Sequence, residues 1–188
     1  SDVFTVKDHS QNTGRRVNLP KPSCTDRPSD CADIDVLNTL DGFNLQPRLS
    51  IAFDGPIDVS TVSSQTGFLL SLGSTLPGGP FPLHVVGINQ VVWDPETFTL
   101  HAESDELLDQ HTRYALIVTA GVHDLDGEPV RGPGSRGPEA EGVVRAVRGA
   151  GFGFGPIAGI SLFTTQSATS TLEKVRAQVK RATPAPAD

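Results

Sequence analysis

Three alternating acidic residues, Asp124, Asp126 and Glu128, are the clearest candidates for binding chemistry in the sequence. Clustered carboxylate oxygens are the ligands that a hard cation such as Ca²⁺ prefers. The spacing is not that of an EF-hand loop, and Gly127 supplies the backbone freedom that a tight turn needs. We therefore interpret the segment as a hairpin turn with solvated carboxylates, which leaves these three residues as a weak calcium candidate. No other metal ion and no cofactor is expected.

Motifs that would supply a catalytic nucleophile do not occur in the sequence. The string nearest to a Gly-x-Ser-x-Gly elbow is centred on Ser135, but Pro133 stands where the first glycine is needed. The alternating glycines from Gly149 to Gly155 do not match a dinucleotide-binding fingerprint. The histidines are scattered, at His9, His84, His101, His111 and His123. The sequence therefore predicts a chain that is not an enzyme.

Cys24 and Cys31 are the only cysteines, and they lie seven positions apart in a segment rich in Pro, Ser and Asp. One interpretation is a local disulfide in an exported protein. Closing so short a loop would stabilise the fold by roughly 2.5 kcal/mol. The other is a pair of free surface thiols in a cytosolic protein. A zinc site is not expected, because no second Cys/His pair has ligand spacing.

Composition favours a turn-rich β protein. The 188 residues include 19 Gly and 15 Pro, and 37% of them are hydrophobic, which fits one domain or one domain with a small extension. The net charge is −7 without a dense Lys/Arg cluster, so nucleic acid is not an expected partner. No apolar run is long enough for a transmembrane segment. The absence of Met predicts a processed mature form or a fragment.

The elements that position any site are clearest between Val91 and Val130. Val91–Trp93 favours a strand, Asp94–Thr97 is a turn, and Phe98–Ala102 alternates with period two, so the three segments predict a hairpin. Tyr114–Thr119 is a third strand with Tyr114, Leu116 and Val118 on one face. The stretch therefore predicts an antiparallel meander. The predicted core includes Ile51, Phe53, Trp93, Tyr114, Leu116 and Val118.

Helical patterns flank this strand-rich stretch. Ala32–Leu40 predicts a short helix, and Glu139–Arg148 predicts another with Val143, Val144 and Val147 directed inward. Residues 149–159 predict an ordered, irregular loop, followed by a strand that begins at Ile160. Ser167–Arg181 has the clearest helical pattern of the chain, with a narrow apolar stripe at Leu172, Val175 and Val179.

Three regions follow from these elements. Residues 1–44 form an irregular N-terminal arm with the cysteine loop. Residues 45–166 form a β-sandwich that contains a Gly-rich insert at 131–159. Residues 167–188 form a C-terminal helix and a stiff Pro/Ala linker, and a linker after a helix predicts that a further domain once followed.

A pattern of strand and turn residues resembles the bacterial Ig-like domain of the S-layer type. It consists of Leu49–Phe53, Asp58-x-Ser60-Thr61-Val62, Phe68-Leu69-Leu70, Trp93, Leu108, Tyr114-x-Leu116-x-Val118-Thr119 and Gly121-Val122-x-Asp124-x-x-Gly127. The resemblance covers about residues 45–130. It implies a mostly β fold, an Ig-like antiparallel β-sandwich with an irregular N-terminal arm and a C-terminal helix.

The flanking segments are similar to the N-terminal region of large secreted bacterial lipase or esterase-like proteins. The matching segments are Val17–Pro20, Leu40–Phe43 and Phe163–Thr169. In that group an Ig-like module precedes an α/β-hydrolase domain. No position here matches the nucleophile, acid or histidine of that domain, so no catalytic residue is assigned. The Gly-rich residues 131–159 depart from the longer helical insert that is usual in the group.

The resemblance implies a non-catalytic accessory module of an exported bacterial lipase or esterase-like protein, acting in domain spacing, stabilisation or surface binding. Its expected partner is a C-terminal catalytic domain or another surface protein, and its expected location is secreted or at the cell surface. The alternative is a structural or adhesive cell-surface subunit that self-associates through its sheet edges.

Overall fold

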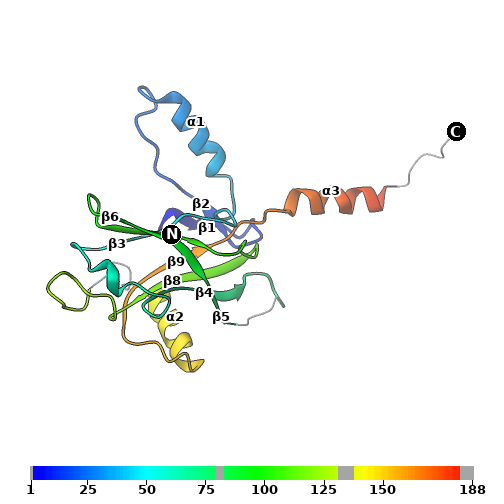
Figure 1. The fold of residues 1–188 in the computed structure, drawn as a ribbon. Coiled ribbons are helices and arrows are strands. Elements are labelled where there is room, and N and C mark those ends of the chain that lie inside the picture. The colour runs from blue at the N-terminus through cyan, green and yellow to red at the C-terminus, as the bar shows by residue number, and fades with distance from the viewer. Residues whose placement is uncertain (1, 79–82, 131–137, 183–188) are drawn as a thin grey trace.

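The protein is built from two facing antiparallel sheets, with helix α2 on the outer face of the larger one (Figure 1). The structure is a computed structural model that describes residues 2–78, 83–130 and 138–182. The smaller sheet has the order β3-β7-β6, with β3 at Leu49–Ala52, β7 at Thr99–Ser104 and β6 at Ile88–Asp94. The larger sheet has the order β5-β4-β8-β9, with β5 at His84–Val86, β4 at Gly67–Ser74, β8 at Thr112–Thr119 and β9 at Ile157–Thr164. The predicted mostly β, sandwich-like fold with a C-terminal helix is confirmed.

The remaining elements lie outside these sheets. Among the described residues they are η1 at Asp2–Phe4, β1 at Thr5–Lys7, β2 at Arg15–Val17, α1 at Pro28–Leu37, η2 at Val59–Thr61, α2 at Pro138–Gly149 and α3 at Ser170–Arg181. The N-terminal arm is more regular than predicted, because β1 and β2 pair as an antiparallel hairpin. The Val17 N–H donates to the Leu40 carbonyl at 2.8 Å, which joins this hairpin to the segment that follows α1.

The predicted hairpin of β6 and β7 is present, but the predicted meander is wrong. β6 pairs with β7, whereas β8 pairs with β4 and β9 in the other sheet. The chain therefore changes sheets between Ser104 and Thr112. A period-two pattern identifies which face of a strand is buried, and it does not identify the neighbouring strand. Ala115 and Ile117, which are fully buried between the core-facing residues of β8, are the sequence signal for a strand covered on both sides.

The core between the two sheets contains most of the residues predicted for it. Its buried members are Leu49, Ile51, Phe53, Ile57, Leu69, Val86, Leu100, Ala102, Leu108, Tyr114, Leu116, Val118, Val122, Val130 and Phe163. Trp93 is only partly buried at its margin, because β6 is an edge strand. The indole packs edge-on against Phe53, with ring centroids 6.0 Å apart, and so covers one end of this core.

A second core lies between the larger sheet and α2. Val143 and Val147 of α2 are buried there, whereas Val144, also predicted to point inward, is only partly buried. The irregular loop after α2 adds Phe154, whose ring stacks on Phe68 at a centroid distance of 3.9 Å. The predicted loop is therefore part of the core, and β9 begins three residues earlier than predicted, at Ile157. Residues 131–137 of the predicted Gly-rich insert lie outside the described residues.

Two helix boundaries differ from prediction for local reasons. α1 begins at Pro28 instead of Ala32, because proline fits the first turn of a helix without losing a hydrogen bond. Cys31 therefore lies in the first turn of α1, where it forms a disulfide with Cys24 (S–S 2.01 Å). α3 begins at Ser170 instead of Ser167, since the residues before Ser170 bind other parts of the chain, as described below. The predicted linker at 183–188 lies outside the described residues.

Tyr114 provides a test of the core between the sheets. Its ring stacks on Phe163 at 5.5 Å, and its hydroxyl accepts a hydrogen bond from the Asp109 N–H at 3.0 Å. Burial raises the pKa of Tyr114 to about 12, from the ordinary value of 10.0. Since the folded-state pKa is raised, the neutral phenol stabilises the fold fully below about pH 10, the pKa of an unfolded tyrosine, and this contribution is lost as the pH rises towards 12.

We expect the Tyr114 phenol to ionise near pH 12 in the native protein and near pH 10 in denaturant. The chain has one tyrosine, so ultraviolet absorbance of phenolate follows this residue alone. Tyr114→Phe should reduce the loss of stability between about pH 10 and 12 relative to the unmodified protein. Ionisation near pH 10 in the folded protein would contradict the burial of this residue.

Candidate functional site

Helices α1 and α3 stand away from the sandwich on its N-terminal hairpin side (Figure 1). The residues that precede α3 run beside the segment that follows α1. The Phe43 N–H donates to the Thr164 carbonyl and the Gln166 N–H donates to the Phe43 carbonyl, both at 2.8 Å. The two helices therefore leave the sandwich at the same place, where Phe43 meets Thr164 and Gln166. We call this place the base of the helices.

Gly42 permits the close approach of these two segments. A Cβ at this position would lie 2.7 Å from the backbone of Thr164, Thr165 and Gln166. Backbone atoms cannot move aside as the end of a flexible side chain can. Glycine is therefore required at position 42, where this segment meets the end of β9.

A polar cluster of buried Asp41, buried His111 and partly buried Ser167 fixes this base. The Ser167 N–H donates to Asp41 Oδ1 at 2.8 Å, and Ser167 Oγ donates to Asp41 Oδ2. Ser167 Oγ also lies 2.8 Å from His111 Nδ1. The Thr13 hydroxyl donates to the Asp41 carbonyl. We call Thr13, Asp41, His111 and Ser167 the clamp.

Gln110 adds a second attachment next to the clamp. Its side-chain oxygen accepts a hydrogen bond from the Thr169 N–H at 3.0 Å, and its Nε2 donates to Thr169 Oγ1 at 2.8 Å. Thr169 is the N-cap residue of α3. The loop that enters β8 therefore holds α3 through two consecutive residues, Gln110 and His111. His111 adopts a φ of +54° in this loop.

The clamp contains the residue types of a serine hydrolase triad in a different order. In a triad the imidazole lies between the carboxylate and the hydroxyl, so that it can take the serine proton. Here the hydroxyl of Ser167 lies between Asp41 and His111. Because its single proton is donated to the carboxylate, its oxygen can accept from His111 Nδ1–H. These hydrogen bonds hold three chain segments together, and their order does not activate Ser167 as a nucleophile.

Sequence reasoning missed the clamp. The sequence places Asp41 in a flanking segment, His111 among the scattered histidines and Ser167 at the start of a helix, with nothing that links the three. Strand pairing brings these residues together from positions 70 and 56 apart. No spacing within a single sequence indicates such a contact. The strongest signal in the sequence is the Asp41-Gly42 dipeptide, because glycine is used where two backbone segments approach closely.

The candidate calcium residues form the turn that the sequence predicts for them. Asp124 Oδ1 accepts hydrogen bonds from the Asp126 N–H at 3.0 Å and the Glu128 N–H at 2.9 Å, and Gly127 has a φ of +82°. A hollow of about 1000 Å³ lies beside this turn. Within the described residues, no three His, Cys, Asp or Glu side chains gather closely enough to hold a metal ion.

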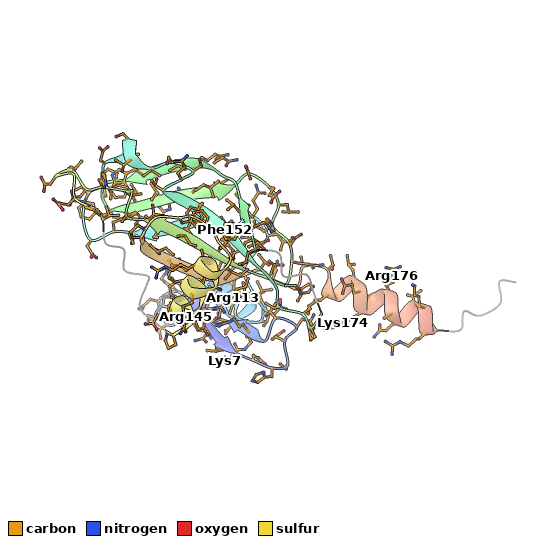
Figure 2. The ribbon with its side chains drawn as sticks, turned by 90° about the horizontal axis from the view of Figure 1, so that it is seen from below. Lys7, Arg113, Arg145, Phe152, Lys174 and Arg176 are labelled. Atoms are coloured by element: carbon orange, nitrogen blue, oxygen red, sulfur yellow. A yellow bond between two sulfur atoms is a disulfide. The ribbon has the colours of Figure 1, made fainter. Side chains whose placement is uncertain are left out.

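A group of four charged side chains attaches the N-terminal arm to β8 and α2. Arg15 Nη2 and Arg113 Nη2 lie 2.9 and 2.6 Å from the Glu139 carboxylate, and Nε of each lies within 3.7 Å of Asp2 Oδ2. Burial raises the pKa of Asp2, and the two arginines lower it in part. Figure 2 shows Arg113 close to α2. The two arginines and the two carboxylates neutralise one another, so we assign this group a structural role.

α3 presents an apolar surface that no part of the described chain covers. The exposed fractions of Leu172, Val175 and Val179 are 71%, 49% and 67%. Lys174 and Arg176 project from the same helix on its way out from the body (Figure 2). Since the sandwich buries its other large apolar clusters in two cores, this stripe and the base that holds it are the best candidate for a functional surface.

Comparisons with known proteins assign no family. No family model matches the chain, and no curated protein matches it significantly. The similarity to S-layer-type Ig-like domains therefore stays a prediction. Among the described helices, none has the length and apolar character needed to cross a membrane.

Gly42→Ala tests the shared base of the two helices. We expect the added methyl group to lower the free energy of unfolding by about 1–3 kcal/mol, because it meets the backbone of β9. Gly55→Ala is the matched control, since a Cβ there meets nothing within 4 Å. Thermal unfolding followed by circular dichroism measures both. Equal melting temperatures for the two variants would show that the segments do not approach as described.

Proposed function

We propose that this chain is a non-catalytic accessory module that binds a partner through the end of the sandwich carrying α1 and α3. The observation that carries the proposal is the stripe of Leu172, Val175 and Val179, which lies exposed on a helix held away from the body. Leaving such side chains in water gives up roughly 1.5–3 kcal/mol for each one that a partner would fully bury. A binding role recovers that free energy.

The clamp supports binding over catalysis. Ser167 is the one serine that contacts both a histidine and a carboxylate among the described residues. Its hydroxyl is committed to Asp41, and both Asp41 and His111 are buried. Ser167 itself is only partly buried and lines a hollow of about 310 Å³. The order of the contacts, with the hydroxyl between the carboxylate and the imidazole, is therefore what favours attachment of α3 over catalysis.

The sequence and the disulfide support the proposed location and parent of the module. The resemblance in residues 45–130 and in the flanking segments supports an exported bacterial lipase or esterase-like protein. The Cys24–Cys31 disulfide fits an oxidising compartment such as the periplasm or the cell exterior. In that setting the module spaces, stabilises or docks a catalytic domain or another surface protein.

Self-association through sheet edges is the second candidate function. The edge strand β6 favours it, because Val91 and Val92 on this strand are exposed. Strand addition, however, needs a regular row of free backbone groups. Pairing of β6 shifts register between Asn89 and Val92, and Gln90 between them has a φ of +48°. This bulge makes β6 a poor template for another strand.

Ester hydrolysis and one serine variant test the proposal. We expect the purified chain to hydrolyse a p-nitrophenyl ester no faster than buffer. Ser167→Ala should instead lower the free energy of unfolding by about 1–3 kcal/mol, because the buried Asp41 carboxylate loses a hydrogen-bond donor. Ser64→Ala, at an exposed position, is the control and should change stability by less than about 0.5 kcal/mol.

Both measurements use the same preparations, with circular dichroism to confirm folding. Turnover that disappears in folded Ser167→Ala protein and persists in Ser64→Ala protein would replace the proposed function with a hydrolase. Turnover unaffected by either variant would also overturn it and direct attention to another site.

A further inference from the structure

We propose that the apolar stripe of α3 docks on α1 of a second copy of this chain, so that copies associate head to tail. The inference rests on the proposed function, because it identifies the partner of the same α1 and α3 surface. It departs from the sheet-edge mechanism, since helices form the contact.

The width of the α3 stripe fits a helical partner. Leu172, Val175 and Val179 follow one another at spacings of three and four residues, which is the pattern of a seam between two packed helices. Helices that lie in a membrane surface have a broad apolar face, commonly with Trp or Phe. α3 has no aromatic residue. The stripe is therefore better matched to one side of another helix than to lipid.

The charge of α3 restricts the identity of that helix. Lys174, Arg176, Lys180 and Arg181 oppose the single acid Glu173, so α3 carries a net charge of +3 in a chain whose net charge is −7. Glu173 is already bound by the hydroxyl of Thr169 at 2.5 Å. The cations flanking the stripe therefore favour an acidic partner.

α1 has the complementary composition. It contains Asp30, Asp33 and Asp35 and no Lys or Arg, which gives a net charge of −3. Asp30 pairs with Arg27 and Asp35 pairs with Lys21, so Asp33 is the acid of α1 that no cation of the described chain pairs. It also exposes apolar side chains, with Val36 66% and Leu37 43% exposed. A helix of opposite charge with uncovered apolar groups is thus present on every copy of the chain.

α1 is held rigidly enough to serve as a docking surface. The disulfide fixes its first turn to Cys24. At its other end, the Asn38 side chain accepts a hydrogen bond from the Leu19 N–H at 2.6 Å and donates to the Leu19 carbonyl at 3.1 Å. Binding then requires little ordering of α1, which reduces the entropic cost of association.

The arrangement of the two helices favours contact between copies. α1 and α3 share a base but point in different directions from it (Figure 1). The clamp and Gln110 fix the direction of α3 at Ser167 and Thr169. Because α3 of one copy meets α1 of the next, the contact joins two different surfaces, and copies add head to tail unless the rotation between them closes a ring or a reciprocal dimer. Two helices of 10 and 12 residues form a small interface, so association should be weak and concentration-dependent.

Two double variants separate the halves of this contact. The α1 variant carries Asp33→Lys and Val36→Lys, and the α3 variant carries Val175→Glu and Val179→Glu. All four positions are exposed, so the monomer should fold in both cases. Leu125→Glu, at an exposed apolar position on the turn after β8, is the control.

Sedimentation velocity over a range from micromolar to near-millimolar protein provides the readout. We expect the unmodified chain and Leu125→Glu to form larger species as concentration rises, and each double variant alone to stay monomeric. An equimolar mixture of the two double variants should form a dimer and stop there. In that mixture the intact α3 of the α1 variant meets the intact α1 of the α3 variant, and neither complex can extend.

Several outcomes would overturn the inference. The unmodified chain could remain monomeric throughout, or the mixture of variants could fail to dimerise. Association that persists in both variants would assign the contact to another surface, such as the sheet edges. Binding of the monomeric chain to anionic phosphatidylglycerol vesicles, lost in the α3 variant, would assign α3 to lipid. None of these results produces ester turnover, so failure here stays distinguishable from failure of the proposed function.

Discussion

The burial of β8 on both faces is the constraint on which the rest of the structure depends. Tyr114, Leu116 and Val118 enter the core between the sheets, while Ala115 and Ile117 enter the core under α2. A strand with no face in water needs a layer on each side. The smaller sheet supplies one layer, and α2 with its Phe-containing loop supplies the other. Burial of this strand therefore makes a three-layer protein from a two-sheet sandwich.

The position of β8 also determines how the projecting helices are held. The residues that lead into this strand, Gln110 and His111, bind Thr169 and Ser167 at the base of α3. Asp41 brings the segment after α1 to the same point. A strand that is buried on both faces thereby holds the helix whose apolar stripe is exposed. This arrangement supports the proposal that the protein presents α1 and α3 to a partner.

Local patterns in the sequence predicted elements well and long-range partners poorly. Period two identified β7 and β8, and the Gly127 turn followed from residue types that favour a tight turn of the backbone. The predicted meander was wrong, because hydrophobic alternation carries no information on which strand lies next to another. The clamp was missed for a related reason, because Asp41, His111 and Ser167 meet only after β8 and β9 have paired. The stripe on α3 was visible in the sequence, but its exposure depends on what the body leaves uncovered.

Hydrogen exchange measured by mass spectrometry at low and high protein concentration tests the central claim, that this fold exists to present α1 and α3 for binding. At low concentration we expect β8 amides to exchange most slowly and amides of α3 to exchange rapidly. At high concentration, protection should increase in peptides from α1 and α3 and remain unchanged in β6. Protection that rises in β6 or β5, or in no peptide at all, would contradict the account.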